Sequence, residues 1–346
     1  MTKQSLTNLE QQILDTIQDA FPLEERPYRT LAEKLGSDEL TVFAAVENLR
    51  HSGIIRRIGG IYDSARLGFI SRLCAGKIPS VATGASDDSA LEAFVAAVEN
   101  EKSITHNYVR SHEYNVWFTV MGECEDVIRK IVDKLCKSTA LSDVHILKAT
   151  KKYKINTVMR GANATVDGRQ EVAEGGNNGI PDDEYPKITG SDRARIRIVC
   201  NDIPHTLTPF ADWGVSLAEL RSDLRQKRMR RFGAIIRHQQ AGFAHNAMVC
   251  FCLDERGKSV GLSTFPELAE GTCVGSILAK NPHVSHCYER PAFEGFPYNL
   301  YAMMHAQSAE DLDRYVEEAA ASIGNPDYAV LYSLRELKKT SYRFFE

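Results

Sequence analysis

No apolar run in this 346-residue chain approaches the roughly 20 consecutive residues that a membrane-spanning helix needs. The first residues, MTKQSLTNLEQQ, are polar and lack the apolar core of a signal peptide. Neither sign of charge dominates, and a net charge of −4 argues mildly against a protein whose main task is to grip nucleic acid. We therefore expect a globular, cytoplasmic protein, with 43% hydrophobic residues to build its cores.

Paired cysteines are also missing from the sequence. The eight cysteines are scattered, and the only close pair, Cys250 and Cys252, would point to opposite faces of a strand. No second pair completes a zinc site. We interpret the cysteines as reduced, mostly buried thiols that hold no metal.

The chain contains two copies of one plan. RRIGGIYDSARLGF at 56–69 aligns without a gap with RRFGAIIRHQQAGF at 230–243. HNYVRSHEYNVW at 106–117 and HCYERPAFEGFPYNLY at 286–301 share the skeleton His-x-Tyr-x-Arg, a spacer, and Tyr-Asn. Between the copies, residues 159–190 are rich in Gly, Asn and Asp, which predicts a flexible linker.

Each copy has the pattern of a helix-turn-helix followed by alternating strands and helices. In copy one, residues 6–58 predict three short helices, and GIIRRIGGIYDS after them predicts a β-wing. The order beyond the wing is strand, helix, strand, strand, helix, strand, as in a ferredoxin-like sandwich. We predict an α+β fold with a winged helix-turn-helix at 1–62, a ferredoxin-like domain at 63–158, a degenerate winged helix-turn-helix at 191–240 and a second ferredoxin-like domain at 241–346.

This pairing of domains resembles the Lrp/AsnC family of transcriptional regulators, so DNA binding has to be weighed. A recognition helix needs Arg, Lys, Asn or Gln where it meets base edges. Several positions of the expected helix in copy one, which opens at Ser37, are instead apolar or acidic: it offers Thr41, Val42, Phe43, Ala44, Ala45, Glu47 and Asn48, with Arg50 and His51 only at its end. The corresponding region of copy two is shorter. Two helix-turn-helix domains of unequal length would also lose the symmetric half-site spacing that dimeric regulators use. We expect no specific DNA binding.

A more specific resemblance rests on motifs that occur in the same order in both halves. The first half has IQDAFPLEERPY, IRRIGG, LGF and HNYVRSHEYNVWFT, and the second has RRFGAIIRHQQAGFAHNAM, HCYERP, PYNLYAMMH and RELKKTSYRFF. Together they resemble the siroheme decarboxylases, which occur as paired homologous subunits with the Lrp/AsnC architecture. The chain resembles both subunits joined in one, over nearly all of residues 6–158 and 192–346.

The resemblance implies a carboxy-lyase that converts siroheme to 12,18-didecarboxysiroheme with loss of two CO₂. Fused forms of this kind are associated with haem d1 biosynthesis, and separate pairs with the alternative haem route. The iron is part of the substrate, so no separate cofactor is implied. We expect a pseudo-heterodimer within one chain or a homo-oligomer, with siroheme and its product as ligands and no membrane or specific DNA partner. A ligand-sensing transcriptional regulator of the Lrp/AsnC type is the alternative.

Such a reaction needs cations for the anionic rim of the substrate, an apolar aromatic slot, and an acid that protonates carbon as CO₂ leaves. In an extended strand, His286, Tyr288 and Arg290 would share one face. Copy two also has His238 where copy one has Ser64, so we predict His286 and His238 as catalytic residues. The predicted substrate-binding residues are Arg57, His106, Arg110, Arg231, Arg237, Tyr288, Arg290, Tyr298, Tyr301, His305, Lys338 and Lys339.

The asymmetry between the copies predicts that copy two is catalytic and copy one mainly supports it. Copy two has the extra histidines His238 and His305, and its longer spacer at 291–297 is expected to form a loop over its own site. Structural alternatives stay open for each group. His286 can be a hydrogen-bonded core residue, His238 a solvated wing residue, the two tyrosines near residue 300 packing residues, and the closing lysines caps of helix or strand ends.

Overall fold

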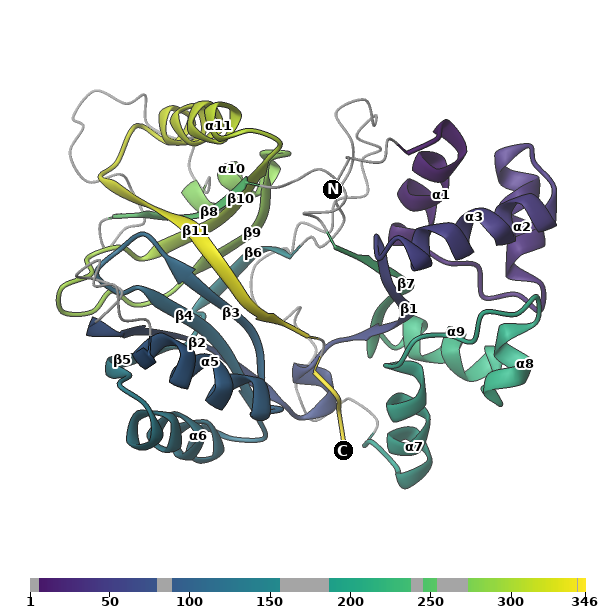
Figure 1. Ribbon diagram of the computed structural model, residues 1–346, viewed down its shortest axis with the longest axis horizontal. Coiled ribbons are helices and arrows are strands. Elements are labelled where there is room, and N and C mark those ends of the chain that lie inside the picture. Colours follow the sequence, from purple (N-terminus) through teal and green to yellow (C-terminus); the bar gives the residue numbers. More distant parts are fainter. Residues whose placement is uncertain (1–5, 80–88, 156–186, 238–244, 254–272, 341) are drawn as a thin grey trace.

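The computed structural model describes residues 6–79, 89–155, 187–237, 245–253, 273–340 and 342–346. Within these ranges the two copies have the same order of elements, and the predicted α+β fold is confirmed. Figure 1 shows the helix-turn-helix elements of both copies gathered at one end and the large sheet with its covering helices at the other. None of the helices in the described ranges is long and apolar enough to cross a membrane.

The copy-one helix-turn-helix consists of α1 (Asn8–Asp19), α2 (Pro27–Leu35) and α3 (Glu39–His51). A capping box between Thr7 and Glu10 starts α1, and Gly36 ends α2 in the left-handed conformation that the tight turn requires. Copy two has α7 (Gly190–Val199), α8 (Pro209–Trp213) and α9 (Leu217–Arg225). Its third helix has nine residues where α3 has thirteen, in line with the expected shortening.

The segment expected to form a wing in each copy is a single strand that pairs with its counterpart in the other copy. β1 (Ile55–Tyr62) and β7 (Met229–Ile236) form a two-stranded antiparallel ribbon in which Gly59 lies opposite Gly233. A Cβ atom on Gly59 would lie 2.4 Å from the Asn201 carbonyl oxygen, and one on Gly233 would lie 2.6 Å from that of Ile17. The repeated glycine therefore lets each strand pack closely against the helices of the other copy.

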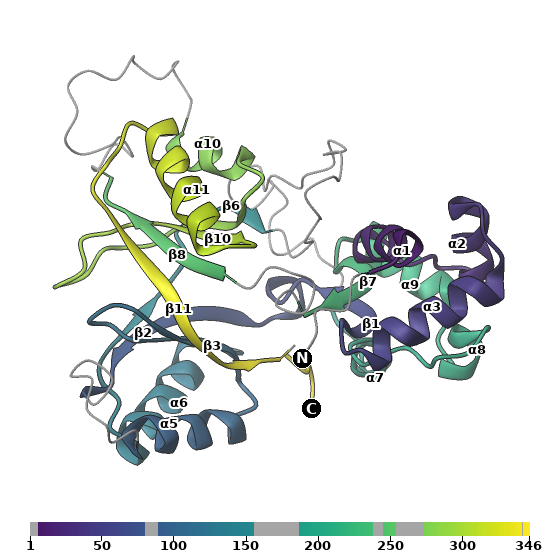
Figure 2. The ribbon, with the colours of Figure 1, turned by 45° about the horizontal axis from the view of Figure 1, so that its top comes forward.

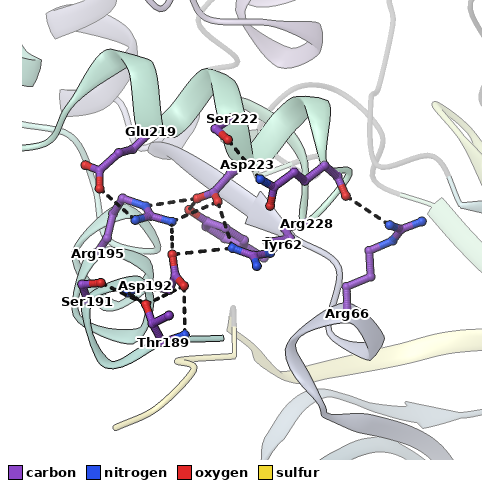
Figure 3. Close-up of polar contacts among 11 residues, drawn as sticks. Tyr62, Arg66, Thr189, Ser191, Asp192, Arg195, Glu219, Ser222, Asp223 and Arg228 are labelled. Atoms are coloured by element: carbon purple, nitrogen blue, oxygen red, sulfur yellow. Dashed lines mark hydrogen bonds and ion pairs between the residues drawn. The ribbon is translucent and has the colours of Figure 1, made fainter. Parts of the chain in front are cut away.

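A buried ion-pair network joins this ribbon to the copy-two helices (Figure 3). The Asp223 carboxylate accepts a hydrogen bond from the Tyr62 hydroxyl at 2.9 Å and two from the Arg195 guanidinium at 3.0 and 3.2 Å. Arg195 also pairs with Asp192, and Arg228 lies 3.5 Å from Asp192. Because the Asp223 side chain is only 2% exposed, the pairing links the two copies with little screening by water.

Each ferredoxin-like domain has four strands and two helices. Copy one contains β2 (Ile70–Lys77), α5 (Ser89–Asn100), β3 (Ile104–Arg110), β4 (Val116–Gly122), α6 (Glu125–Ser138) and β5 (Ser142–Leu147). Copy two contains β8 (His245–Phe251), α10 (Val274–Lys280), β9 (Val284–Glu289), β10 (Leu300–Ala306), α11 (Ala309–Ser322) and β11 (Tyr328–Lys339). The strands of each domain have the spatial order fourth, first, third, second, which is the ferredoxin-like order.

The two domains share strands at both of their junctions. The C-terminal part of β11 leaves β8 and pairs with β3 of copy one, and β6 (Lys151–Ile155) of copy one pairs with β9 of copy two. Since β5 and β6 follow each other in the chain yet stand at opposite ends of the sheet order, the sheet curves round on itself. Figure 2 shows the result, with α5 and α6 on one outer side and α10 and α11 on the other.

Apolar residues fill three layers of this sandwich. One core lies between the copy-one strands and α5 and α6, and another lies between the copy-two strands and α10 and α11. A third joins the inner faces of the copy-one and copy-two halves of the sheet and includes Trp117, Met248, Tyr301 and Leu331. The inner faces of the two copies therefore pack against each other. A polar side chain on either face has neighbours from both copies.

Two lysines cap helices across the copies. The Lys338 ammonium on β11 donates to the carbonyls of Val98, Glu99 and Glu101 at the end of α5. The Lys154 ammonium on β6 donates at 2.8 Å to the carbonyl of Asn281, the C-terminal cap of α10. Each cation adds a charged donor to carbonyls at the end of a helix and interacts favourably with the negative end of that helix.

Replacing Lys338 by alanine should lower the free energy of unfolding by about 1 kcal/mol, because partly buried carbonyls at the end of α5 would lose a charged donor. Equilibrium denaturation with urea measures the change. Lys130, an exposed lysine on α6, is the matched control, and its replacement should leave the midpoint unchanged. An equal loss in both variants would contradict the capping role.

The copy-two loop at 291–297 lies against copy one as well as against Tyr298 and Tyr301 of its own copy. Phe293 stacks on His145 with ring centroids 4.0 Å apart, and Phe296 packs against Trp117 at 5.5 Å. The Tyr114 hydroxyl donates to the Glu294 carbonyl at 3.2 Å. The two phenylalanines find their apolar surface in the core between the sheets, which only the assembled copies provide.

Candidate functional site

Two polar clusters occupy equivalent places in the two copies, where the β1–β7 ribbon meets the shared strands. The copy-two cluster consists of Asp63, Lys152, Arg230, His286, Tyr288 and Arg290. The copy-one cluster consists of Arg56, His106, Tyr108, Arg110, Arg237 and Glu336. The repeated His-x-Tyr-x-Arg phrase supplies three members of each cluster, on β9 and β3 or at their ends. The remaining members come from the ribbon, from the residues next to it and from β6 or β11.

In the copy-two cluster, cations surround the tyrosine. Lys152 lies opposite Tyr288 in the strand register, and the Arg290 guanidinium carbon is 5.2 Å from the centre of the Tyr288 ring. Arg230 pairs with Asp63 at 3.0 Å. Burial lowers the pKa of Lys152, and the charges of Arg230 and Arg290 add to this effect while Asp63 opposes it. The cluster therefore holds more positive charge than its one carboxylate offsets, as in an anion-binding site.

The Nδ1 atom of His286 contacts the hydroxyl of Ser285, which in turn contacts a second histidine, His305. The Ser285 hydroxyl oxygen lies 3.0 Å from His286 Nδ1, 3.0 Å from His305 Nε2 and 3.2 Å from the Met303 carbonyl oxygen. Burial, with the positive charges of Arg230 and Lys154, lowers the pKa of His286 to about 4. Both imidazoles are thus neutral near pH 7, since burial also lowers the pKa of His305 to about 3.

The copy-one cluster also holds three cations and one carboxylate, but its carboxylate stands where copy two has a lysine. Glu336 lies opposite Tyr108, where Lys152 faces Tyr288 in copy two, and the Tyr108 hydroxyl donates to its carboxylate at 3.1 Å. Burial raises the pKa of Glu336, while the charges of Arg56 and Arg237 oppose the rise. In copy one the tyrosine hydroxyl is therefore already hydrogen-bonded to a carboxylate of the chain itself. In the described part of the chain, the Tyr288 hydroxyl makes no hydrogen bond.

The arginine of each repeated phrase reaches across to the other copy. Arg110 donates to the Leu331 carbonyl at 3.0 Å, and Arg290 donates to the Leu147 carbonyl at 2.6 Å. Burial lowers the pKa of both guanidinium groups, to about 10 for Arg110. Each arginine thus helps to join the copies. The Arg290 guanidinium also makes cation–π contacts with the rings of Tyr288 and Tyr301.

Two of the predicted arginines face the helix-turn-helix side of the ribbon. Arg231 donates to the Gln18 carbonyl, and Arg57 donates to the Gly60 carbonyl at 3.4 Å. Their sequence neighbours Arg230 and Arg56 lie toward the clusters instead, because successive side chains of a strand point to opposite faces. The alternation was available from the sequence, but the choice of face depended on the pairing of β1 with β7.

The other predicted residues are distributed between core and cluster. Tyr301 is buried opposite Tyr288 in the register, and Tyr298 packs on Phe296 with ring centroids 4.9 Å apart. Lys338 caps α5, and Lys339 lies opposite His106 at the end of β11. His238 lies outside the described residues, whereas Arg237 contributes charge to the copy-one cluster. Sequence reasoning missed Asp63, Lys152, Glu336 and Ser285, because no local pattern brings them to the clusters.

The helix that would read DNA in copy one contacts the other copy. His205 stacks on Phe43 of α3 with ring centroids 4.0 Å apart, and Arg50 at its end pairs with Asp202 at 2.5 Å. The outward face of α3 includes Leu40, which is 66% exposed, and neither lysine nor arginine lies on that face before Arg50. A face without cations before Arg50 gives little attraction to phosphates.

Comparison with known proteins agrees with this architecture. The family model described as AsnC-like ligand binding domain matches the chain twice, at residues 66–154 and 240–338. A second model, described as siroheme decarboxylase NirDL-like HTH domain, matches residues 10–56. The first model alone covers more than half of the chain, and its two matches fall on the two ferredoxin-like domains.

Three similar proteins are described as siroheme decarboxylases. A siroheme decarboxylase from Hydrogenobacter thermophilus is 29% identical over 96% of this chain and 94% of its own length. A siroheme decarboxylase alpha subunit from Desulfovibrio desulfuricans is 39% identical over 45% of this chain and 84% of its own. The crystal structure of the siroheme decarboxylase NirDL in co-complex with an iron-uroporphyrin III analogue matches 98% of this chain and 95% of its own, with 27% identity and a TM-score of 0.64. One half of this chain thus corresponds to most of a whole subunit.

Proposed function

The chain belongs to the siroheme decarboxylase family, and we propose that it converts siroheme to 12,18-didecarboxysiroheme with release of two CO₂. The whole-length likeness to single-chain relatives supports a pseudo-heterodimer made within one chain. The iron belongs to the substrate, so the proposed reaction asks for no further cofactor. The reaction would serve haem d1 or alternative haem biosynthesis, as the resemblance to the siroheme decarboxylases implies.

The observation that carries the proposal is the cationic copy-two cluster on the inner face of the shared sheet. Arg230, Lys152 and Arg290 converge around Tyr288, and only Asp63 opposes them within the cluster. A tetrapyrrole with carboxylates on its rim would pair with these cations, and charge-assisted hydrogen bonds of this kind are the strong ones. Tyr288 and Tyr301 add aromatic surface for the macrocycle.

The proposed reaction needs one proton for each acetate group. The bond between the methylene carbon and the carboxylate breaks, and its electron pair stays on the methylene carbon. That carbon takes a proton from His286 Nε2, so the acetate becomes a methyl group and CO₂ leaves. Burial is the main cause of the lowered pKa of His286, and the charges of Arg230 and Lys154 add to it. Bound carboxylates would offset these two charges and so favour the protonated imidazole.

We assign the reaction to copy two, because the tyrosine of copy one already has a carboxylate partner. Glu336 accepts from the Tyr108 hydroxyl and lies near Arg56 and Arg237, so an incoming carboxylate would have to displace or repel it. In copy two the residue opposite the tyrosine is instead Lys152, whose positive charge attracts an incoming carboxylate.

Incubation of the purified chain with siroheme under anaerobic conditions tests the activity. Mass spectrometry of the tetrapyrrole should show a loss equal to two CO₂, with release of CO₂ in the same ratio. A ligand-sensing regulator would return siroheme unchanged. Siroheme that is bound but not altered by the purified chain would therefore contradict the proposal and favour the regulator.

Replacing Arg230 by alanine should weaken siroheme binding by about 1.5–3 kcal/mol, roughly 10- to 100-fold in Kd, if the ion pair with substrate is desolvated. Titration followed by absorbance of the macrocycle measures the affinity, and circular dichroism checks the fold. The matched control is Arg56→Ala, the same strand position in copy one, which should change affinity less than threefold. Equal losses in both variants would contradict the assignment to copy two.

A further inference from the structure

We propose that Ser285 is a positioning residue that holds His286 in the tautomer with its hydrogen on Nδ1, leaving Nε2 to face the reaction, and that His305 fixes the Ser285 hydroxyl in turn. The inference rests on the proposed function for the role of Nε2, whereas the tautomer itself is a property of the ligand-free chain. The inference rests on the three short contacts of the Ser285 hydroxyl and on the residue equivalent to His305 in copy one, which is not a histidine.

A serine hydroxyl has one hydrogen to donate and two lone pairs to accept with. The Ser285 oxygen has three neighbours at hydrogen-bond distance: the Met303 carbonyl, His286 Nδ1 and His305 Nε2. A carbonyl oxygen cannot donate, so the one hydroxyl hydrogen goes to Met303. Both imidazole nitrogens must then donate to Ser285, which places a hydrogen on Nδ1 of His286 and on Nε2 of His305.

The consequence for His286 follows from its being neutral. A neutral imidazole carries a hydrogen on only one nitrogen, so Nε2 of His286 keeps its lone pair. Among the described residues, Nε2 makes no hydrogen bond. The Tyr288 ring on β9 lies 6.2 Å from the His286 ring between centroids, and the charges of Arg230 on β7 and Lys154 on β6 act on the imidazole. A proton that binds this ring therefore enters and leaves at Nε2, on the side of the copy-two cluster.

The backbone makes the arrangement possible. The pairing of β9 with β10 shifts register between Val284 and His286, so Ser285 forms a bulge and reaches the same neighbourhood as His286. Copy one has the same bulge at Thr105, and Thr105 Oγ1 lies 3.0 Å from His106 Nδ1. Where copy two has His305, the sixth residue of β10, copy one has Met121 in β4. Methionine cannot donate a hydrogen bond, so the second support is particular to copy two.

Nuclear magnetic resonance of ¹⁵N-histidine-labelled, ligand-free chain tests the tautomer directly, since the two imidazole nitrogens give different shifts when protonated. The His286 signals, identified from a His286→Ala sample, should show hydrogen on Nδ1. Ser285→Ala should move the equilibrium toward hydrogen on Nε2, and Ser285→Thr, which keeps the hydroxyl as copy one does, should restore the original signals. A wild-type His286 with its hydrogen on Nε2 would overturn the inference without the use of any variant.

Turnover supplies the second readout. Ser285→Ala should lower kcat about tenfold and change KM less than twofold, as expected of a residue that acts through another. His305→Met, which introduces the copy-one residue, should fall between Ser285→Ala and the wild type, and Thr105→Ala is the control that should leave both quantities unchanged. An unaltered kcat in Ser285→Ala would overturn the positioning role. Absence of turnover in the wild type would instead contradict the proposed function, because the tautomer is measured without substrate.

Discussion

Replacing His286 by alanine should reduce siroheme turnover roughly 10²-fold or more while the chain stays folded. The imidazole is the group whose Nε2 would supply the proton to the acetate carbon, and general acid catalysis of this kind contributes about two to four orders of magnitude. Single-turnover measurement of CO₂ release separates this loss from any change in binding.

His106→Ala is the matched control, because His106 has the same place in the repeated phrase and the same contact from its Nδ1 to a bulged hydroxyl residue. We expect it to change turnover much less, since its cluster already contains Glu336. Equal losses from the two substitutions would contradict the assignment of catalysis to copy two. His238→Ala should be measured beside them, because His238 is the second predicted acid and a larger loss there would move the role to that residue.

Replacing Asp223 by alanine should destabilise the chain by about 3–5 kcal/mol, the usual cost of removing one partner of a buried ion pair. The Arg195 guanidinium would lose two of its hydrogen bonds in a place from which water is excluded, and the Tyr62 hydroxyl would lose its acceptor. Because Tyr62 belongs to copy one and Asp223 to copy two, the β1–β7 ribbon and the helices should separate early in unfolding.

Urea denaturation followed by far-ultraviolet circular dichroism measures this loss. Glu318→Ala removes an exposed partner of Arg314 on α11 and serves as the control, with no measurable change expected. Asp223→Asn keeps the shape of the side chain but loses its charge, so it should fall between the wild type and the alanine variant. Wild-type stability in Asp223→Ala would show that the network does not hold the copies together.

Local patterns sufficed to predict the architecture of each copy. The helix starts predicted at Asn8 and Ser37, the end of α2 at Gly36 and the alternation of apolar residues are set within a few neighbours along the chain. The structure places the two caps one residue away, at Thr7 and Asp38. The repeated phrases likewise indicated strands β3 and β9, where His106 and His286 lie. The family resemblance, and with it the reaction, followed from the same motifs.

Contacts between residues far apart in the sequence decided which of the predicted residues can act together. The amino-acid sequence determined two copies of a helix-turn-helix and a ferredoxin-like domain, and a histidine, a tyrosine and an arginine on one strand of each copy. Only the tertiary structure decided that Arg230 rather than Arg231 joins the copy-two cluster, that Lys152 crosses from copy one to face Tyr288, and that the 291–297 loop covers Tyr114 and His145. The physical reason is that strand register, bulges and exchanged strands are fixed by pairing across the two copies, which no window of neighbouring residues contains.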